Sequence, residues 1–160
     1  TACADAGVDA LITVDLPPEE VDAIDSALAS VGLDNIFLIS PTTPEARIQT
    51  IVERARGFIY YVAVKGVTGS GQLDADEVAR SVSVIRQKTT RPVAVGFGIK
   101  DATSASAVAA SADAVVVGSA LIAKMQQKAQ SGVDLEEIQI HGAAVELLQS
   151  IRVGVDSSPS

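Results

Sequence analysis

Five short apolar runs, separated by segments with a helical pattern, constrain the fold more than any other feature of this sequence. The runs cover residues 10–14, 36–39, 58–64, 93–95 and 114–117. They are rich in β-branched residues and continuous rather than alternating in polarity, as is typical of strands covered on both faces. The helical segments cover residues 18–31, 44–56, 73–88, 102–110 and 121–151, the last with a break near residue 131. This order predicts right-handed βαβ units and a parallel sheet of the α/β class.

The positions of the glycines favour one α/β architecture over another. A doubly wound dinucleotide-binding fold carries Gly-x-Gly-x-x-Gly after its first strand, but here that strand runs into Asp15-Leu16-Pro17-Pro18. Glycines instead follow the last three strands, at Gly66, Gly69, Gly96, Gly98 and Gly118. Phosphate sites after the final strands are typical of (β/α)8 TIM barrels, which usually need about 250 residues. We therefore expect about five C-terminal βα units of such a barrel over residues 1–152, and a disordered tail over residues 153–160.

Composition excludes several classes of function. The chain has 160 residues and a formal net charge of -8, which argues against a nucleic-acid partner because such binding needs a basic surface. Cys3 and His141 are the only cysteine and histidine, so a His/Cys zinc site within one chain is not expected. No apolar run approaches the roughly 20 residues of a membrane span. We expect a reducing, cytoplasmic location, or a plastid if the source is a plant, and a fragment or processed form because an initiator Met is absent.

Glycine pairs at the strand ends are the clearest candidate binding site. Gly96-Phe97-Gly98 follows one strand, and Gly118-Ser119 ends the next and opens a helix. A lone Gly-x-Gly can be just a tight turn, and Ser119 can be just a helix cap. Missing side chains also let backbone N–H groups approach an anion, and helix N-termini hold phosphate. Three such glycine sites on consecutive strands favour a phosphate-binding function.

The remaining candidates each have a structural alternative. Tyr60 and Tyr61 share one strand and so point to opposite faces, one toward the interior and one toward the helices. Asp15 lies at the carboxyl end of a strand, where barrel catalysis occurs, but it could equally cap the following helix. Thr68 fits either a turn or a lid that closes on a ligand. The sequence offers no Ser/His/Asp set, carboxylate pair or metal-ligand spacing.

Several segments together resemble one enzyme family, the tryptophan synthase α subunit. They are Asp15-Leu16-Pro17-Pro18-Glu19-Glu20, Phe37-Leu38-Ile39-Ser40-Pro41-Thr42-Thr43, Tyr60-Tyr61-Val62-Ala63-Val64-Lys65-Gly66-Val67-Thr68-Gly69, Gly96-Phe97-Gly98-Ile99 and Val116-Val117-Gly118-Ser119-Ala120. Their order and spacing match from Thr1 to about Ile151. The resemblance implies a (β/α)8 barrel, of which this chain would supply the part from the end of the third helix through strands four to eight.

The resemblance also implies an activity and partners. The family cleaves indole-3-glycerol phosphate by a retro-aldol step, giving indole and glyceraldehyde 3-phosphate, and passes indole to a β subunit. We expect an α2β2 heterotetramer with pyridoxal phosphate only in the β subunit, and no cofactor in this chain. The implied substrate-phosphate site consists of Gly69, Gly96, Gly98, Gly118 and Ser119.

Further site residues follow from the same resemblance. Tyr60 matches an active-site tyrosine, and Thr68 the threonine of a loop that closes on the substrate. The implied indole pocket is formed by Val14, Ile39, Tyr60 and Phe97. Asp15 and Pro17 match a region that contacts the β subunit.

One part of the family pattern has no match here. The resemblance implies a catalytic glutamate and aspartate that correspond to positions before Thr1, so we expect no catalytic residue in this chain. The intact family member would be a lyase, and the isolated chain inactive. The alternatives are another phosphate-binding barrel, of the indole-glycerol-phosphate synthase or ribulose-phosphate epimerase type, or a non-catalytic module that binds the β subunit.

Overall fold

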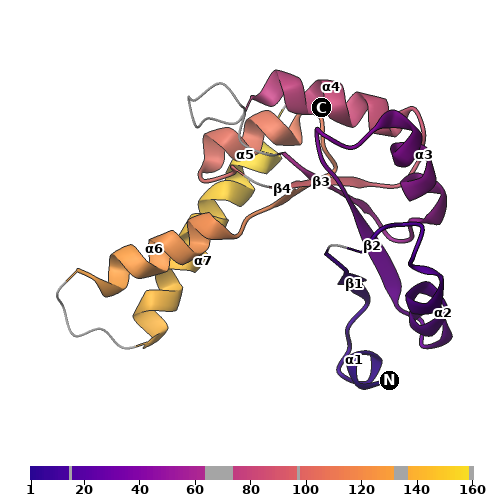
Figure 1. Cartoon of the computed structure of the whole chain (residues 1–160). Coiled ribbons are helices and arrows are strands. Elements are labelled where there is room, and N and C mark those ends of the chain that lie inside the picture. The colour runs from indigo at the N-terminus through magenta and orange to yellow at the C-terminus, as the bar shows by residue number, and fades with distance from the viewer. Residues whose placement is uncertain (15, 64–73, 97, 132–136, 159–160) are drawn as a thin grey trace.

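The computed structural model describes residues 1–14, 16–63, 74–96, 98–131 and 137–158. Within these ranges the chain forms one five-stranded sheet, with strands in the order β1-β2-β3-β4-β5 and all neighbours parallel (Figure 1). The strands are β1 (Ala10–Ile12), β2 (Asp34–Ile39), β3 (Ile59–Val62), β4 (Val93–Gly96) and β5 (Ala114–Val116). Spatial order follows chain order, so the sheet lacks the reversal of a doubly wound fold. It is a partial barrel, as the glycine pattern predicts.

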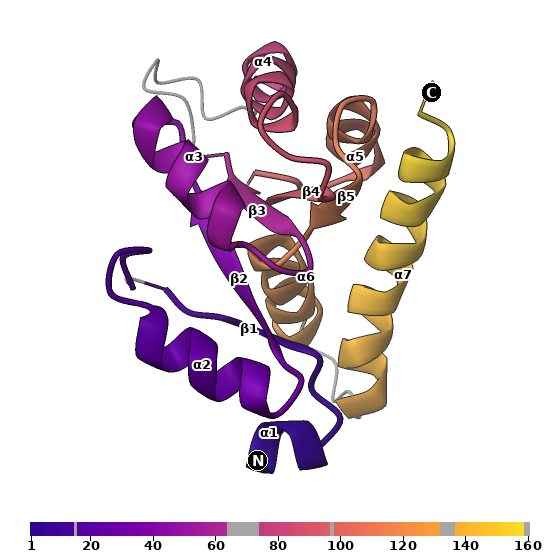
Figure 2. The same cartoon turned by 90° about the vertical axis from the view of Figure 1, so that its right-hand side faces the viewer.

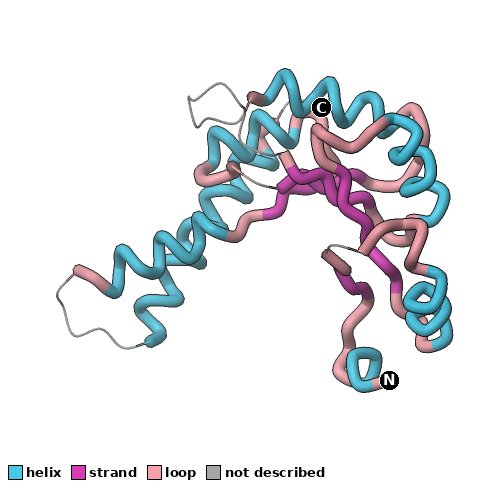
Figure 3. Tube along the Cα trace, in the orientation of Figure 1, coloured by secondary structure: helices cyan, strands magenta, loops and turns pink. Residues whose placement is uncertain are grey.

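Helices follow the strands, and a short one precedes them. They are α1 (Ala2–Asp5), α2 (Asp22–Ser30), α3 (Glu45–Arg54), α4 (Ala75–Arg86), α5 (Ala102–Ala109), α6 (Ser119–Ala129) and α7 (Glu137–Asp156). Figure 3 shows the repeated strand–loop–helix order along the chain. No helix among the described residues is both long and apolar enough to cross a membrane.

The hydrophobic core lies between the sheet and the helices that cover its outer, convex side (Figures 1 and 2). The strands contribute alternate residues to it, and the helices contribute residues at helical spacing. Its fully buried members include Ile39, Ile59, Tyr61, Val82, Ile85, Val93, Val95 and Val108. Aliphatic side chains dominate this core, which follows from the 3% aromatic content of the chain.

The opposite face of the sheet is the inner side of the partial barrel and remains open. One row of paired residues crosses four neighbouring strands and therefore shares this face. From β2 to β5 the row consists of Leu38, Tyr60, Ala94 and Ala114. Ile12 and Val116, on the two edge strands, are 47% and 37% exposed. This inner face carries one of the two tyrosines.

Two boundaries differ from the sequence-based expectation. The first strand ends at Ile12 rather than at residue 14. Helix α7 continues to Asp156, where the sequence predicts a disordered tail from residue 153. Ile151 is buried, Val155 packs against the core, and Arg152 pairs with Asp156 at 2.8 Å, so packing and an i,i+4 ion pair extend the helix. Residues 159–160 lie outside the described ranges.

Candidate functional site

The carboxyl ends of β3, β4 and β5 meet at one edge of the sheet. Val62 pairs with Gly96, and Gly96 pairs with Val116, so Gly96 lies in the middle of this edge. Gly98 and Gly118 come immediately beyond the ends of β4 and β5. The structure therefore brings together three of the five residues predicted to bind phosphate, and Ser119 follows directly. Gly69 and Thr68 lie outside the described residues.

Gly98 has a backbone conformation that favours glycine. Its φ is +83°, in the left-handed region that residues with a Cβ rarely adopt. This turn leads from β4 toward Asp101, the N-cap of α5. The glycine therefore sets the path of the chain as it leaves the sheet edge.

The N-termini of α4 and α5 are closed by side chains. Asp74 accepts hydrogen bonds from the amides of Asp76 and Glu77, both at 3.0 Å. At α5, the Asp101 carboxylate accepts from the Ser104 amide at 2.8 Å, and the Ser104 hydroxyl oxygen accepts from the Asp101 amide at 3.2 Å. This capping box satisfies the donors that a helix start leaves free. The bonds from the Ser104 amide and hydroxyl lower the pKa of Asp101, with a smaller contribution from Lys100.

The N-terminus of α6 has no such cap. Gly118 is the N-cap residue, and no side-chain cap bond forms there. The amides of Leu121 and Ile122 donate to the Gly118 carbonyl at 3.0 and 3.3 Å, so helix geometry leaves the amides of Ser119 and Ala120 without an intrahelical acceptor. Ser119 is the first helical residue rather than the cap, which removes capping as the explanation for its side chain. Both Gly118 and Ser119 are exposed, so this helix start is accessible to an anion.

Tyr60 and Tyr61 point to opposite faces, as strand alternation predicts. Tyr61 is 2% exposed and belongs to the core on the helix side, where its hydroxyl interacts with Ser81 of α4. Tyr60 lies on the inner face with its ring over Gly96: a Cβ placed at Gly96 would be 2.7 Å from Tyr60 Cζ and closer still to the hydroxyl oxygen. Burial raises the pKa of Tyr60. Its hydroxyl is protonated at neutral pH, as that of any tyrosine is, and can donate a hydrogen bond.

The residues predicted to form the indole pocket do not all come together. Val14 is 63% exposed, whereas Ile39 is 1% exposed and lies in the core on the helix side. Leu38, the Cα partner of Tyr60, faces the inner side in place of Ile39. Ile12 also lies there, since it pairs with Ile36, two residues before Leu38. The register between strands, which the sequence pattern does not give, places both residues on this face, and Phe97 lies outside the described residues.

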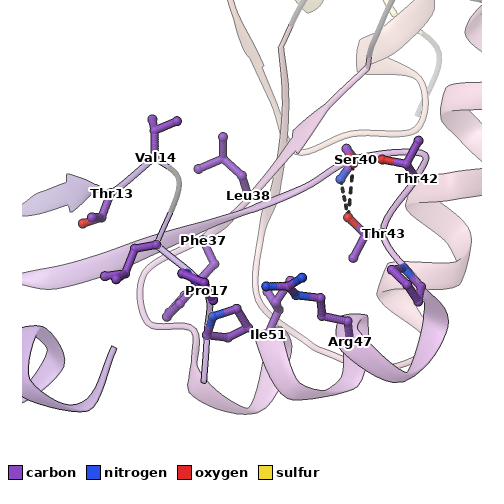
Figure 4. A pocket seen from close by; sticks show the side chains of 13 residues that line it. Thr13, Val14, Pro17, Phe37, Leu38, Ser40, Thr42, Thr43, Arg47 and Ile51 are labelled. Atoms are coloured by element: carbon purple, nitrogen blue, oxygen red, sulfur yellow. Dashed lines mark hydrogen bonds between the residues drawn. The ribbon is translucent and has the colours of Figure 1, made fainter. Parts of the chain in front are cut away.

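A pocket of about 380 Å³ lies at the carboxyl ends of β1 and β2 (Figure 4). Its apolar wall includes Val14, Pro17 and Phe37, and its polar wall includes the hydroxyl of Thr43. Thr43 accepts from the Ser40 amide at 3.0 Å, a bond drawn in Figure 4. The volume suits a small ligand. The pocket thus joins Val14, predicted to contact indole, with Pro17, predicted to contact the β subunit, while Asp15 lies outside the described residues.

Among the described residues that line this pocket, Arg47 is the one charged side chain. Arg47 of α3 reaches its wall and pairs with Glu19 at 3.3 Å. None of the described residues that line the pocket is a carboxylate or a histidine. Across the described ranges no group of three His, Cys, Asp or Glu side chains could hold a metal ion. The described lining of the pocket therefore offers apolar side chains, hydroxyl groups and one guanidinium.

Comparison with known families gives one consistent match. Residues 1–149 match the family model described as the tryptophan synthase alpha chain. The tryptophan synthase alpha chain of Bordetella parapertussis is 52% identical over 152 residues, covering 94% of this chain and 53% of that protein. That of Chromobacterium violaceum is 54% identical over 121 residues, covering 76% and 46%. The chain thus spans about half the length of these relatives.

Solved structures give the same match. The crystal structure of tryptophan synthase subunit alpha from Legionella pneumophila superposes with a TM-score of 0.80 at 36% identity, covering 95% of this chain and 53% of that one. An aminoacrylate-bound form of tryptophan synthase from M. tuberculosis gives a TM-score of 0.77 at 28% identity, covering 95% and 52%. The partial barrel therefore has the fold of the corresponding half of these proteins.

Proposed function

The chain belongs to the tryptophan synthase alpha chain family, and we propose that its glycine-lined strand ends bind the phosphate group of a small phosphate ester. Family membership implies a role in tryptophan biosynthesis. The proposed substrate is indole-3-glycerol phosphate, which the whole protein would cleave to indole and glyceraldehyde 3-phosphate. The chain itself would contribute the phosphate-binding half of that active site.

The uncapped start of α6 is the observation that carries this proposal. Helices α4 and α5 close their own N-termini with Asp74 and Asp101, whereas α6, like α2 and α3, begins without a side-chain cap. Of these uncapped helices, α6 is the one that begins just after β5, at the glycine-bearing edge of the sheet. The free amides of Ser119 and Ala120 adjoin the strand edge that carries Gly96. A phosphate there would accept hydrogen bonds from backbone amides and meet the positive end of the helix dipole.

The other residues of the proposed site have separate roles. Tyr60, with Leu38 and Ile12 on the same inner face, would wall the apolar indole ring. Gly69 would complete the phosphate site, and Thr68 would close a loop over the substrate. No cofactor is needed for these roles in this chain.

We propose that the chain alone lacks the groups for proton transfer. Breaking the carbon–carbon bond of the substrate requires one proton to be removed from a hydroxyl and one to be delivered to the indole ring. A positioned acid or base is worth roughly 10²–10⁴ in rate, and the catalytic glutamate and aspartate implied by the family have no match in this sequence. We therefore propose that the 160-residue chain alone does not cleave the substrate.

A β subunit is the proposed protein partner. Pro17 lines the 380 Å³ pocket at the carboxyl ends of β1 and β2. A β subunit that carries pyridoxal phosphate and docks against Asp15 and Pro17 would receive indole directly. The absence of a carboxylate from the described pocket lining favours a second candidate for the isolated chain, a non-catalytic module that binds this partner.

Phosphate titration tests the proposed site directly. Inorganic phosphate and glycerol 3-phosphate are added to the ¹⁵N-labelled chain, and the amide signals of Gly98, Ser119 and Ala120 are expected to shift together. Gly98→Ala should weaken binding about ten-fold, because hydrogen bonds to a charged group contribute roughly 1.5–3 kcal/mol. Gly32→Ala is the matched control, since Gly32 has φ +76° with nothing within 4 Å of a Cβ and therefore suffers similar backbone strain away from the site.

Two results would overturn the proposal. Saturating shifts confined to residues away from the α6 start would place phosphate elsewhere. Equal affinities for the Gly98→Ala and Gly32→Ala variants would mean that the β4–α5 turn takes no part. Indole release from indole-3-glycerol phosphate by the purified chain would contradict the proposal that it is inactive alone.

A further inference from the structure

The C-terminal helix α7 passes α5 at a point where only glycine fits. A Cβ at Gly154 would lie 2.9 Å from the carbonyl carbon and the Cα of Ala102, and closer still to the Ala102 carbonyl oxygen. These are backbone atoms, which cannot rotate out of the way as the end of a long side chain can. Gly142, earlier in the same helix, has nothing within 4 Å of its Cβ position. Of these two glycines of α7, only Gly154 lies against a neighbouring backbone; Figure 2 shows α7 running beside α5.

Ala102 is the first residue of α5, and Ser104 of the same helix turn is hydrogen-bonded to the residues that precede the helix. The Ser104 hydroxyl oxygen accepts from the Lys100 amide at 3.1 Å and from the Asp101 amide at 3.2 Å. Ile99 is 4% exposed and belongs to the core. Residues 99–104 thus behave as one packed unit that begins directly after Gly98. A displacement at Ala102 would be carried to Gly98 through this unit.

Helix α7 is held on both sides of Gly154. Ile151, three residues before it, is 3% exposed, and Val155 packs against the same core. The helix therefore cannot withdraw at Gly154 without uncovering buried apolar surface. Strain introduced at this position would be shared between α7 and the first turn of α5.

From this contact we propose that Gly154 is a positioning residue for the turn at Gly98. The last helix of the chain would thereby fix the position of the backbone amides that we propose bind phosphate at this turn. The proposal rests on the phosphate-binding function inferred above. Its physical content is a close helix contact that fixes the start of α5. Gly154 touches no ligand and acts only through Ala102.

The test compares Gly154→Ala with Gly142→Ala in the full 160-residue chain. Both substitutions put the same methyl group on the same helix, and only the first meets a neighbouring backbone. Hydrogen exchange of the amides of residues 98–104 is measured by NMR, and inorganic phosphate is titrated against the same samples. Gly154→Ala should speed exchange in this segment and weaken phosphate binding at least about three-fold, while Gly142→Ala should match wild type in both.

Loss of folding in Gly154→Ala would leave a second variant to decide the question. Val155→Ala loosens the anchoring of α7 without creating a clash, and should speed exchange in residues 98–104 to a smaller degree. The proposal is overturned if a folded Gly154→Ala shows the exchange and phosphate affinity of Gly142→Ala, or if faster exchange is confined to α7. Wild type that binds no phosphate would refute the proposed function instead, and the exchange comparison would still report on the helix contact.

Discussion

The ring of Tyr60 occupies the space that a side chain at Gly96 would need. The two residues lie on neighbouring strands, and a Cβ at Gly96 would come within 2.7 Å of Tyr60 Cζ. Gly96 is fully buried beneath this ring. The glycine thus leaves room for an aromatic side chain at the sheet edge where we propose that phosphate binds.

Substituting this glycine should displace the tyrosine. Gly96→Ala is expected to lower the free energy of unfolding by about 1–3 kcal/mol, the usual cost of overpacking, and to change the near-UV circular dichroism of Tyr60. Urea denaturation and near-UV spectra are the measurements. Gly118→Ala is the control, because nothing lies within 4 Å of that Cβ position. Unchanged stability and spectra in Gly96→Ala would show that the Tyr60 ring does not occupy the space of a side chain at Gly96.

Neighbouring residues of β2 should respond differently to truncation. Ile39→Ala is expected to cost about 2–5 kcal/mol of unfolding free energy, since it leaves a cavity in the core. Leu38 lies half-buried on the open face, so Leu38→Ala should cost on the order of 1 kcal/mol. Urea denaturation midpoints, compared at an unchanged m-value, measure the loss of unfolding free energy in each variant. Similar losses for the two variants would mean that Leu38 is also part of a closed core.

This difference marks the limit of what the sequence could predict. The four residues Ile36-Phe37-Leu38-Ile39 are all apolar, so their pattern identifies a strand but not which residues face the helices. The register decides the face, and it is fixed by the pairing of Leu38 with Tyr60 across the sheet. Ile39, predicted to line the indole pocket, therefore lies in the core on the helix side, one residue from the inner-face position of Leu38, in a strand that was correctly located.

The start of α6 illustrates the same limit in a loop. The sequence predicts a helix start near Gly118 and Ser119 and leaves open whether Ser119 caps it. Which residue is the N-cap depends on the backbone angles, and in the structure the N-cap residue is Gly118. The alternation of strands and helices and the glycines at strand ends were predictable because each of these features is supported by a pattern of many residues. The orientation of a single side chain is not supported by a pattern of several residues, so the sequence alone does not predict it.

Acid should weaken the fold partly through Asp113. Its carboxylate accepts from the Val93 amide at 2.8 Å and pairs with Arg86 at 2.8 Å, linking β5, β4 and α4. Partial burial would raise the pKa of Asp113, but the Val93 and Arg86 bonds outweigh it and lower the pKa. A lowered folded-state pKa means that the stabilisation is present above about pH 3.9, the value for an unfolded aspartate, and is lost as the pH falls through the folded value.

Removing this carboxylate should flatten that part of the acid response. Asp113→Asn is expected to be less stable than wild type at pH 7 and to lose less of its stability between pH 5 and pH 2, approximately the range over which aspartates titrate. Urea midpoints across this range measure it. Asp5→Asn, at an exposed position on α1, controls for the loss of one negative charge. Parallel pH profiles for wild type and Asp113→Asn would exclude the proposed linkage.

The two tyrosines should titrate above their usual range. The chain has two tyrosines and no tryptophan, so tyrosinate absorbance reports on Tyr60 and Tyr61 alone. Burial raises the pKa of both; at Tyr61 the Ser81 hydrogen bond opposes this and the charge of Glu77 adds to it. Because the folded pKa values are raised, their contribution to stability is complete below about pH 10, the ordinary value, and is lost as the pH rises through the folded values.

Spectrophotometric titration can separate the two phenols. Native protein is expected to give both transitions above pH 10, and protein in concentrated urea to give them at about pH 10. Tyr60→Phe should leave a single transition that belongs to Tyr61 in the core, while Tyr61→Phe leaves that of Tyr60 on the inner face. A Tyr60 transition at or below the value in urea would mean that water reaches the phenol freely, and its ring could not then cover Gly96 as the structure describes.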